Sequence, residues 1–441
     1  MRIARIFPII FLLLSFTFEA RAQFLMDMID TTTELGKGMI SMYQKYDALR
    51  FSGYIQPQWQ MAESKGAAGY AGGDFGAAVN NRFSLRRGRI RVDYERYDKN
   101  NMPVVQFAFQ FDGTERGVFI RDFYGRFFET KFNLFSLAGG MFARPFGYEV
   151  NLSSADRETP ERGRMSQILM KTERDLGAMV SFEPRRKDHP LSFLKIDLGA
   201  FNGQGLAATT DFDSHKDIIG RVAVKPLRIK GTVSVISGGV SVLYGGMQQF
   251  TNVINKMGTV NGQPVFVVDS AASNNGKIAP RHYFGADVQW KLSNGPGKGS
   301  TQLRAEYIFG SQTATALTTE TPAVIPVGPD GKLAPLYIRS FDGAYLYFLQ
   351  HLGSDKHQVV VKYDWYDPNK KVSGKDIKPG SGLTPADISY KTLGVGYIYY
   401  SNEHLKFMFY YDWVTNEKTQ LEGYKEDLKD NVFTCRMQYR F

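Results

Sequence analysis

The chain has almost no cysteine, the residue on which redox and disulfide chemistry depend. It contains one cysteine in 441 residues, so it can form no intramolecular disulfide. Its six histidines are scattered and show neither HExxH nor another metal-ligand spacing. The sequence also lacks the GxSxG, GxxxxGK[ST] and Rossmann glycine patterns. We therefore expect no metal, no cofactor and no catalytic residues.

Long hydrophobic runs are also missing after the first 22 residues, so the sequence predicts no membrane-spanning helix there. The N-terminus itself has positive charges at Arg2 and Arg5, an apolar run over 6–18, and small residues at Ala20 and Ala22. This order predicts a secretory signal peptide over residues 1–22. A membrane anchor is the alternative, but the run is shorter than the roughly 20 residues that a spanning helix needs.

Aromatic and charged residues, in contrast, are plentiful. Hydrophobic residues make up 43% of the chain and aromatic residues 14%, which excludes a disordered protein. The formal net charge of +10 suits nucleic acid, an acidic surface or an anionic solute. Because the signal peptide directs the chain out of the cytoplasm, we expect no nucleic-acid partner.

Residues 23–48 have a helical pattern, with apolar residues three and four positions apart. The pattern consists of Leu25, Met28, Ile29, Leu35, Met39 and Tyr43. It predicts a short N-terminal amphipathic helix that lies against the main domain or associates with a second copy.

From residue 51 onward the hydrophobic period changes to two. Phe107 and Phe109 alternate with Gln106 and Gln110, and residues 405–413 alternate in the same way. One face of each segment is apolar and aromatic, and the other is polar and often charged. Segments of about ten residues with this alternation are typical of strands with lipid on one side and water on the other.

Sixteen such segments can be counted, and an even number suits a single-chain outer-membrane barrel. They cover about 51–62, 82–97, 102–112, 117–128, 132–142, 174–183, 192–201, 217–226, 232–247, 281–292, 300–310, 339–351, 357–366, 390–400, 404–415 and 431–441. Short turns and mostly long loops alternate between them. Because a sheet in lipid must leave no edge unpaired, the last strand should pair with the first. The sequence thus predicts an all-β, 16-stranded antiparallel transmembrane barrel over residues 49–441.

The longest charged connection runs over about 143–173, between the fifth and sixth predicted strands. It is too polar to form a hydrophobic core, and it is longer than a simple connection between two strands needs to be. We expect it to fold into the pore as a constriction loop. Its candidate solute-facing cations are Arg144, Arg157, Arg162, Arg164 and Lys171.

A column of arginines is expected to line the pore. Arg87, Arg89 and Arg91 lie on the strand face opposite Ile90 and Val92. A lipid-facing arginine costs roughly 2–4 kcal/mol near the bilayer midplane, so these side chains should point inward. The same parity argument places four further arginines in the lumen: Arg126, Arg221, Arg281 and Arg304. The phase of Arg121, which matches that of outward phenylalanines, is not explained by simple alternation.

Guanidinium groups bind oxyanions well because they stay charged and offer paired donors. The inward positions therefore favour an anion-preferring pore. Carboxylates such as Asp93, Asp287 and Asp364 are placed inward by the same parity, however. Ion pairs that only stiffen the wall are the alternative interpretation.

Several stretches resemble one family, the phosphate-selective porins O and P. The resemblance is carried by Gly140–Glu149, Arg174–Gly177, Phe201–Gly205, Val361–Asn369 and Leu393–Tyr397. It implies a 16-stranded barrel in the bacterial outer membrane, often homotrimeric, that passes small anions. Members known for phosphate have a lysine-rich constriction, whereas residues 143–174 hold one lysine, Lys171.

The expected function is passive diffusion of small hydrophilic solutes with a preference for anions such as phosphate or other oxyanions. A non-selective general porin is one alternative. A surface barrel that binds partners through its long loops is another. An outer-membrane hydrolase would need a serine and a histidine side by side, and nothing in the sequence places Ser153 or Ser154 near His282.

Overall fold

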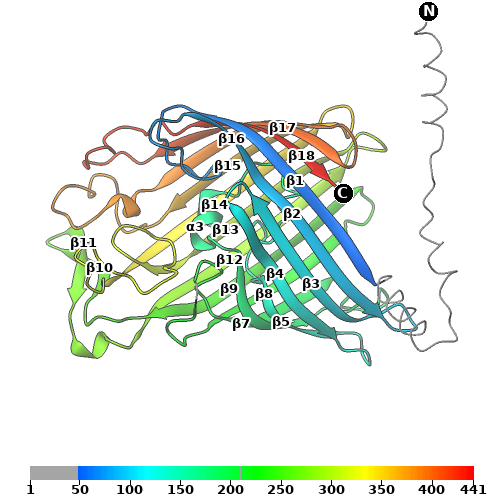
Figure 1. Ribbon diagram of the computed structural model, residues 1–441, viewed down its shortest axis with the longest axis horizontal. Coiled ribbons are helices and arrows are strands. Elements are labelled where there is room, and N and C mark those ends of the chain that lie inside the picture. The colour runs from blue at the N-terminus through cyan, green and yellow to red at the C-terminus, as the bar shows by residue number, and fades with distance from the viewer. Residues whose placement is uncertain (1–47, 209) are drawn as a thin grey trace, which may run out of the picture. The chain divides into compact units, whose positions relative to one another are not determined.

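The computed structural model describes residues 48–208 and 210–441. The predicted signal peptide and N-terminal helix therefore fall, up to residue 47, outside the described part of the chain. The strands of the described residues form one continuous, mainly antiparallel sheet that curls into a barrel (Figure 1).

The strands follow the predicted segments closely. They are β1 (Leu49–Ala62), β2 (Asn81–Tyr97), β3 (Pro103–Thr114), β4 (Gly117–Phe128), β5 (Phe135–Ala143), β6 (Arg174–Phe182), β7 (Leu194–Phe201), β8 (Asp217–Arg228), β9 (Ser234–Gln248), β10 (Ile254–Val260), β11 (Gln263–Asp269), β12 (Ile278–Ser293), β13 (Ser300–Ala314), β14 (Leu336–His351), β15 (His357–Asp367), β16 (Tyr390–Tyr400), β17 (Leu405–Asn416) and β18 (Val432–Arg440). The short helices are α3 (Arg164–Leu169), η2 (Ala272–Asn274) and η3 (Pro385–Asp387).

Sixteen of these strands close the barrel, as predicted. Each pairs with its neighbour in the chain, β9 pairs with β12, and β1 pairs with both β2 and β18. This closure satisfies the backbone groups at every edge, which a sheet in lipid requires.

The two remaining strands lie in the long connection between the predicted strands 232–247 and 281–292, where no strand was predicted. β10 and β11 form a hairpin in that loop, and β10 also pairs with β14 in parallel. Asn261 and Gly262 connect the two strands with φ angles of 51° and 78°. Positive φ at both positions is the geometry that an Asn-Gly hairpin turn provides.

The alternation of outward and inward residues is confirmed along the strands. In β2, Ile90 is 52% exposed, whereas its neighbour Arg89 is 5% exposed. In β17, Phe409 and Trp413 are exposed and Tyr410 is buried. The apolar outer band therefore faces lipid, and the charged positions face the interior. No helix among the described residues is long and apolar enough to cross a membrane.

A bulge between β3 and β4 explains the phase of Arg121. The register passes from Gln110↔Asp122 to Phe111↔Ile120, so Arg121 has no partner across the ladder. An extra residue of this kind shifts the side-chain alternation by one position. Arg121 consequently points inward, where its Nη2 lies 2.7 Å from Glu173, while Phe119 and Phe123 stay exposed.

The segment between β5 and β6, residues 144–173, lies inside the barrel and is called the inner loop below. It carries the helix α3, which lies within the ring of strands in Figure 1. Phe146, Met165 and Leu169 of this loop join inward side chains such as Phe201 and Tyr283 in one buried apolar cluster. Part of the inward face that contacts the loop is therefore apolar.

Candidate functional site

The inner loop begins with a sharp turn at Gly147, where the chain leaves the wall. Gly147 has a φ of 68°, a conformation that favours glycine. The Glu306 carboxylate of β13 accepts hydrogen bonds from the backbone N–H groups of Tyr148 (3.0 Å) and Glu149 (3.1 Å). A Cβ at position 147 would overlap Oε1 of Glu306. The turn of Pro145, Phe146 and Gly147 thus brings the backbone into contact with this buried carboxylate.

We expect Gly147→Ala to disturb the inner loop without unfolding the barrel. The strained φ costs about 1–3 kcal/mol, and the new methyl group displaces Glu306. The expected result is increased protease cleavage within residues 144–173 in the folded barrel. Gly231→Ala, in the short turn between β8 and β9, is the control, because it has a comparable φ of 78° but no atom within 4 Å of its Cβ. Equal loop cleavage in the two variants would contradict this account.

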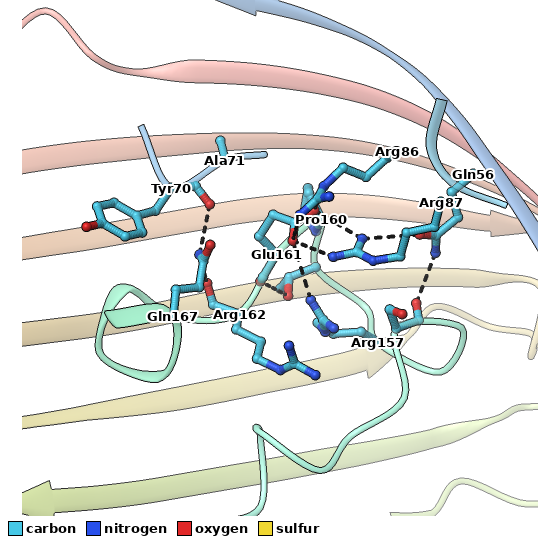
Figure 2. A network of polar contacts seen from close by, with 12 residues as sticks. Gln56, Tyr70, Ala71, Arg86, Arg87, Arg157, Pro160, Glu161, Arg162 and Gln167 are labelled. Carbon is cyan, nitrogen blue, oxygen red and sulfur yellow. Dashed lines mark hydrogen bonds and ion pairs between the residues drawn. The ribbon is translucent and has the colours of Figure 1, made fainter. Parts of the chain in front are cut away.

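Glu161 is the main anchor of the inner loop. Its carboxylate accepts hydrogen bonds from Arg86 (2.8 Å), Arg87 (2.7 Å) and Arg436 (3.1 Å). Figure 2 shows Glu161 between the β2 arginines, with Arg157 of the loop nearby. Burial alone would raise the pKa of Glu161, but the three guanidinium groups hold it well below its usual range.

Further contacts fix the loop to other parts of the wall. Glu158 forms a bidentate pair with Arg304 of β13, with both distances 2.8 Å. Lys406 of β17 donates to the carbonyl oxygens of Ala155 (2.9 Å) and Arg157 (3.1 Å). The loop leaves the wall between β5 and β6 and bonds to the distant strands β13 and β17. It therefore crosses the lumen.

A cavity of about 750 Å³, called the vestibule below, lies on the long-loop side of the inner loop. Seven cationic and six acidic side chains line it. The cations are Arg86, Arg87, Arg89, Arg121, Arg162, Arg164 and Lys171, and the acids are Asp74, Asp112, Glu161, Glu173, Glu320 and Asp430. Its volume falls in the range of pockets that hold small organic solutes.

Among the vestibule arginines, Arg89 and Arg121 have guanidinium N–H groups that donate no hydrogen bond to the described residues and could bind a solute. Within the described residues, Arg89 donates only from Nε, to Asp112 at 3.1 Å, and Arg121 only from Nη2, to Glu173. Glu173 is shared with Arg174 and Arg162. Burial opposes ionisation of Glu173, yet Arg162, Arg174 and Arg121 keep its pKa well below the usual range.

All but one of the twelve cations predicted for the site lie within 4.0 Å of a carboxylate in the described structure. In the wall, the pairs are Arg87–Glu161 (2.7 Å), Arg89–Asp112 (3.1 Å), Arg91–Asp93 (2.7 Å), Arg221–Asp287 (2.6 Å), Arg304–Glu158 (2.8 Å) and Arg281–Asp217. In the loop, they are Arg144–Asp175 (3.9 Å), Arg157–Glu161 (3.8 Å), Arg162–Glu173 (3.5 Å), Arg164–Asp430 (4.0 Å) and Lys171–Glu320 (2.5 Å).

The exception is Arg126 of β4, which has no carboxylate this close among the described residues and packs over the ring of Tyr124 at 5.9 Å. It lies near the short-turn end of its strand, away from the vestibule. Four of the twelve predicted residues therefore lie elsewhere in the wall, outside the vestibule and unattached to the inner loop: Arg91, Arg126, Arg221 and Arg281.

Two vestibule arginines, Arg86 and Arg121, could not be assigned from the sequence alone. Arg86 has the parity of the outward Ile90, yet both Arg86 and Arg87 bond to Glu161. The alternation therefore changes phase between two consecutive residues, and the only signal in the sequence is the arginine pair itself. The inward direction of Arg121 depends on a bulge that has no signature in a single sequence.

No group of three or more histidine, cysteine, aspartate or glutamate side chains in the described part of the chain is arranged to hold a metal ion.

Comparison with known proteins gives a family match over part of the chain and a fold for nearly all of it. The family described as "Phosphate-selective porin O and P" matches residues 339–441, which confirms the predicted resemblance over the last five strands. A comparison with curated proteins found no match.

Two solved structures illustrate the similarity of the fold. One is a loop L8 deletion mutant of OmpT, an outer membrane protein of Vibrio cholerae, at 10% identity and a TM-score of 0.51, with 89% of this chain and 99% of that chain covered. The other is the outer membrane channel DcaP of Acinetobacter baumannii, at 12% identity and a TM-score of 0.51, with 89% and 97% covered. The fold is that of an outer-membrane porin, and the chain is a protein of the bacterial outer membrane.

Proposed function

We propose that this bacterial outer-membrane barrel, which matches the phosphate-selective porin O and P family over its last five strands, is a passive channel that prefers small anions. The inner loop narrows the lumen and leaves the vestibule as the point where solutes are selected. A 16-stranded barrel is wide enough for an aqueous channel beside such a loop. A homotrimer is part of the proposal, because the family resemblance implies it.

The observation that carries the anion preference is the lining of the vestibule. Seven cations face six carboxylates there, so the net charge is positive. The unused donors of Arg89 and Arg121 can replace water around an oxyanion, while the neighbouring carboxylates keep binding weak enough for release. Phosphate is one candidate solute within this class.

A non-selective general porin is the second candidate. It is favoured by the pairing of eleven predicted cations with carboxylates, because paired charges attract a mobile ion less strongly than isolated ones. The two candidate functions share the same barrel and inner loop. They differ in how strongly the channel prefers anions over cations.

Planar bilayers containing the purified mature protein test the channel. We expect stepwise, ohmic currents in KCl, and partial block when inorganic phosphate is added at constant ionic strength. Currents without phosphate block would favour the general porin. Absence of any current would overturn the channel and leave a role for the long loops in binding partners.

A further inference from the structure

A smaller cavity of about 30 Å³ adjoins the vestibule, with which it shares Tyr70, Arg164 and Asp430. It lies between the β1–β2 loop, the inner loop and strands β15 to β18. Its volume suits one group of the size of a water molecule. We call it the side pocket.

Two of the carboxylates that line the side pocket, Asp412 and Asp430, accept no hydrogen bond from another side chain of the described residues. Asp430 is 6% exposed, and its Oδ1 accepts no hydrogen bond within the described structure. Its Oδ2 lies 4.0 Å from Arg164, beyond hydrogen-bonding distance. Asp412 of β17 lines the same pocket, and its side chain takes part in none of the ion pairs or side-chain hydrogen bonds of the described residues. Burial raises the pKa of Asp430 to about 6, which reflects this weak compensation.

Among the described residues, none of the cations beside the pocket donates a hydrogen bond to Asp412 or Asp430. Arg164 is stacked against the rings of Tyr70 (4.4 Å) and Tyr390 (3.6 Å). Lys362 pairs with Asp364 at 3.0 Å, and Arg162 donates to the carbonyl oxygens of the loop at Glu149 and Val150. Asp412 and Asp430 thus remain as two acceptors around a space for one small group.

The arrangement favours an ammonium group over a metal ion. The described residues contain no metal-binding group of three or more side chains, whereas a primary ammonium needs only a few acceptors around three rotatable donors. The side pocket opens beside a cavity rich in arginine. A solute that fits both has an ammonium group at one end and a carboxylate at the other.

We propose that Asp412 and Asp430 form an ammonium subsite, and that the vestibule preferentially binds zwitterionic solutes of the amino-acid or short-peptide class. The subsite deepens the proposed channel function and rests on it. The arginine side binds the acidic group of the solute, and the side pocket selects those that also carry an ammonium.

Block of the KCl current by two matched probes tests the subsite. L-glutamate and glutarate share a five-carbon diacid skeleton, and glutarate is the smaller and the more anionic. A channel with anion preference alone binds glutarate at least as well. We expect glutamate to block at about tenfold lower concentration, the ratio expected for one charged hydrogen-bonded contact.

The double variant Asp412→Asn/Asp430→Asn should conduct KCl and lose the preference for glutamate. Asp188→Asn, in an exposed turn, should keep it. Equal block of the wild-type channel by both probes would overturn the ammonium subsite, and a glutamate preference that survives in the double variant would overturn its assignment to these residues. Absence of KCl current in the wild-type protein would instead overturn the proposed channel itself.

Discussion

Replacing Glu161 with Gln is expected to release the inner loop and to raise the single-channel conductance above that of the wild-type barrel. Glu161 is the common partner of Arg86, Arg87 and Arg436. Neutralising it leaves several largely buried guanidinium groups without a counter-charge. Removal of one partner from a buried ion pair costs about 3–5 kcal/mol. We therefore also expect the barrel to unfold at a lower temperature, as measured on semi-native gels.

The matched control for this variant is Asp188→Asn. Asp188 pairs with Arg186 in the β6–β7 turn, where the two side chains are 69% and 60% exposed. An exposed pair of this kind contributes little to stability, so conductance and thermal stability should stay at wild-type values. A Glu161→Gln protein that behaves like the control would mean that the loop is held by its apolar cluster and not by its ion pairs.

The double variant Arg89→Gln/Arg121→Gln is expected to reverse the charge preference of the channel. Both side chains line the vestibule and keep donors available. With both neutralised, the seven lining cations become five against six carboxylates, so the net charge of the lining changes sign. The chloride-to-potassium permeability ratio should fall from above one to below one.

The control for the selectivity variant is Arg126→Gln, which removes one inward cation away from the vestibule. A smaller change in the permeability ratio is expected there, because selection takes place at the vestibule. If Arg126→Gln changes the ratio as much as the double variant does, the attractive field comes from the whole wall and the vestibule is not the selecting site.

The barrel could be predicted from the sequence because lipid and water impose opposite requirements on alternate residues. The exposed Ile90 beside the buried Arg89 illustrates this pattern, and the exposed Phe409 beside the buried Tyr410 shows it in β17. The hairpin of β10 and β11 could also have been predicted, because Asn261-Gly262 is a strong turn signal between alternating residues. The length of the surrounding loop obscured it.

The pairing of the charges could not be predicted. Glu161 bonds to Arg86 and Arg436, which are 75 and 275 positions away in the chain. Parity shows that a side chain points inward, but it does not show which part of the inner loop lies opposite. The same limit applies to the apolar cluster around Phe146, since inward tyrosines and phenylalanines conflict with a simple water-filled lumen.

The central claim is that the vestibule attracts anions into an open channel. The zero-current potential of the wild-type protein in a planar bilayer, under a tenfold KCl gradient, tests it most directly. We predict a potential of the sign set by chloride. A potential of the sign set by potassium would contradict the claim, because the carboxylates of the lining would then dominate its arginines.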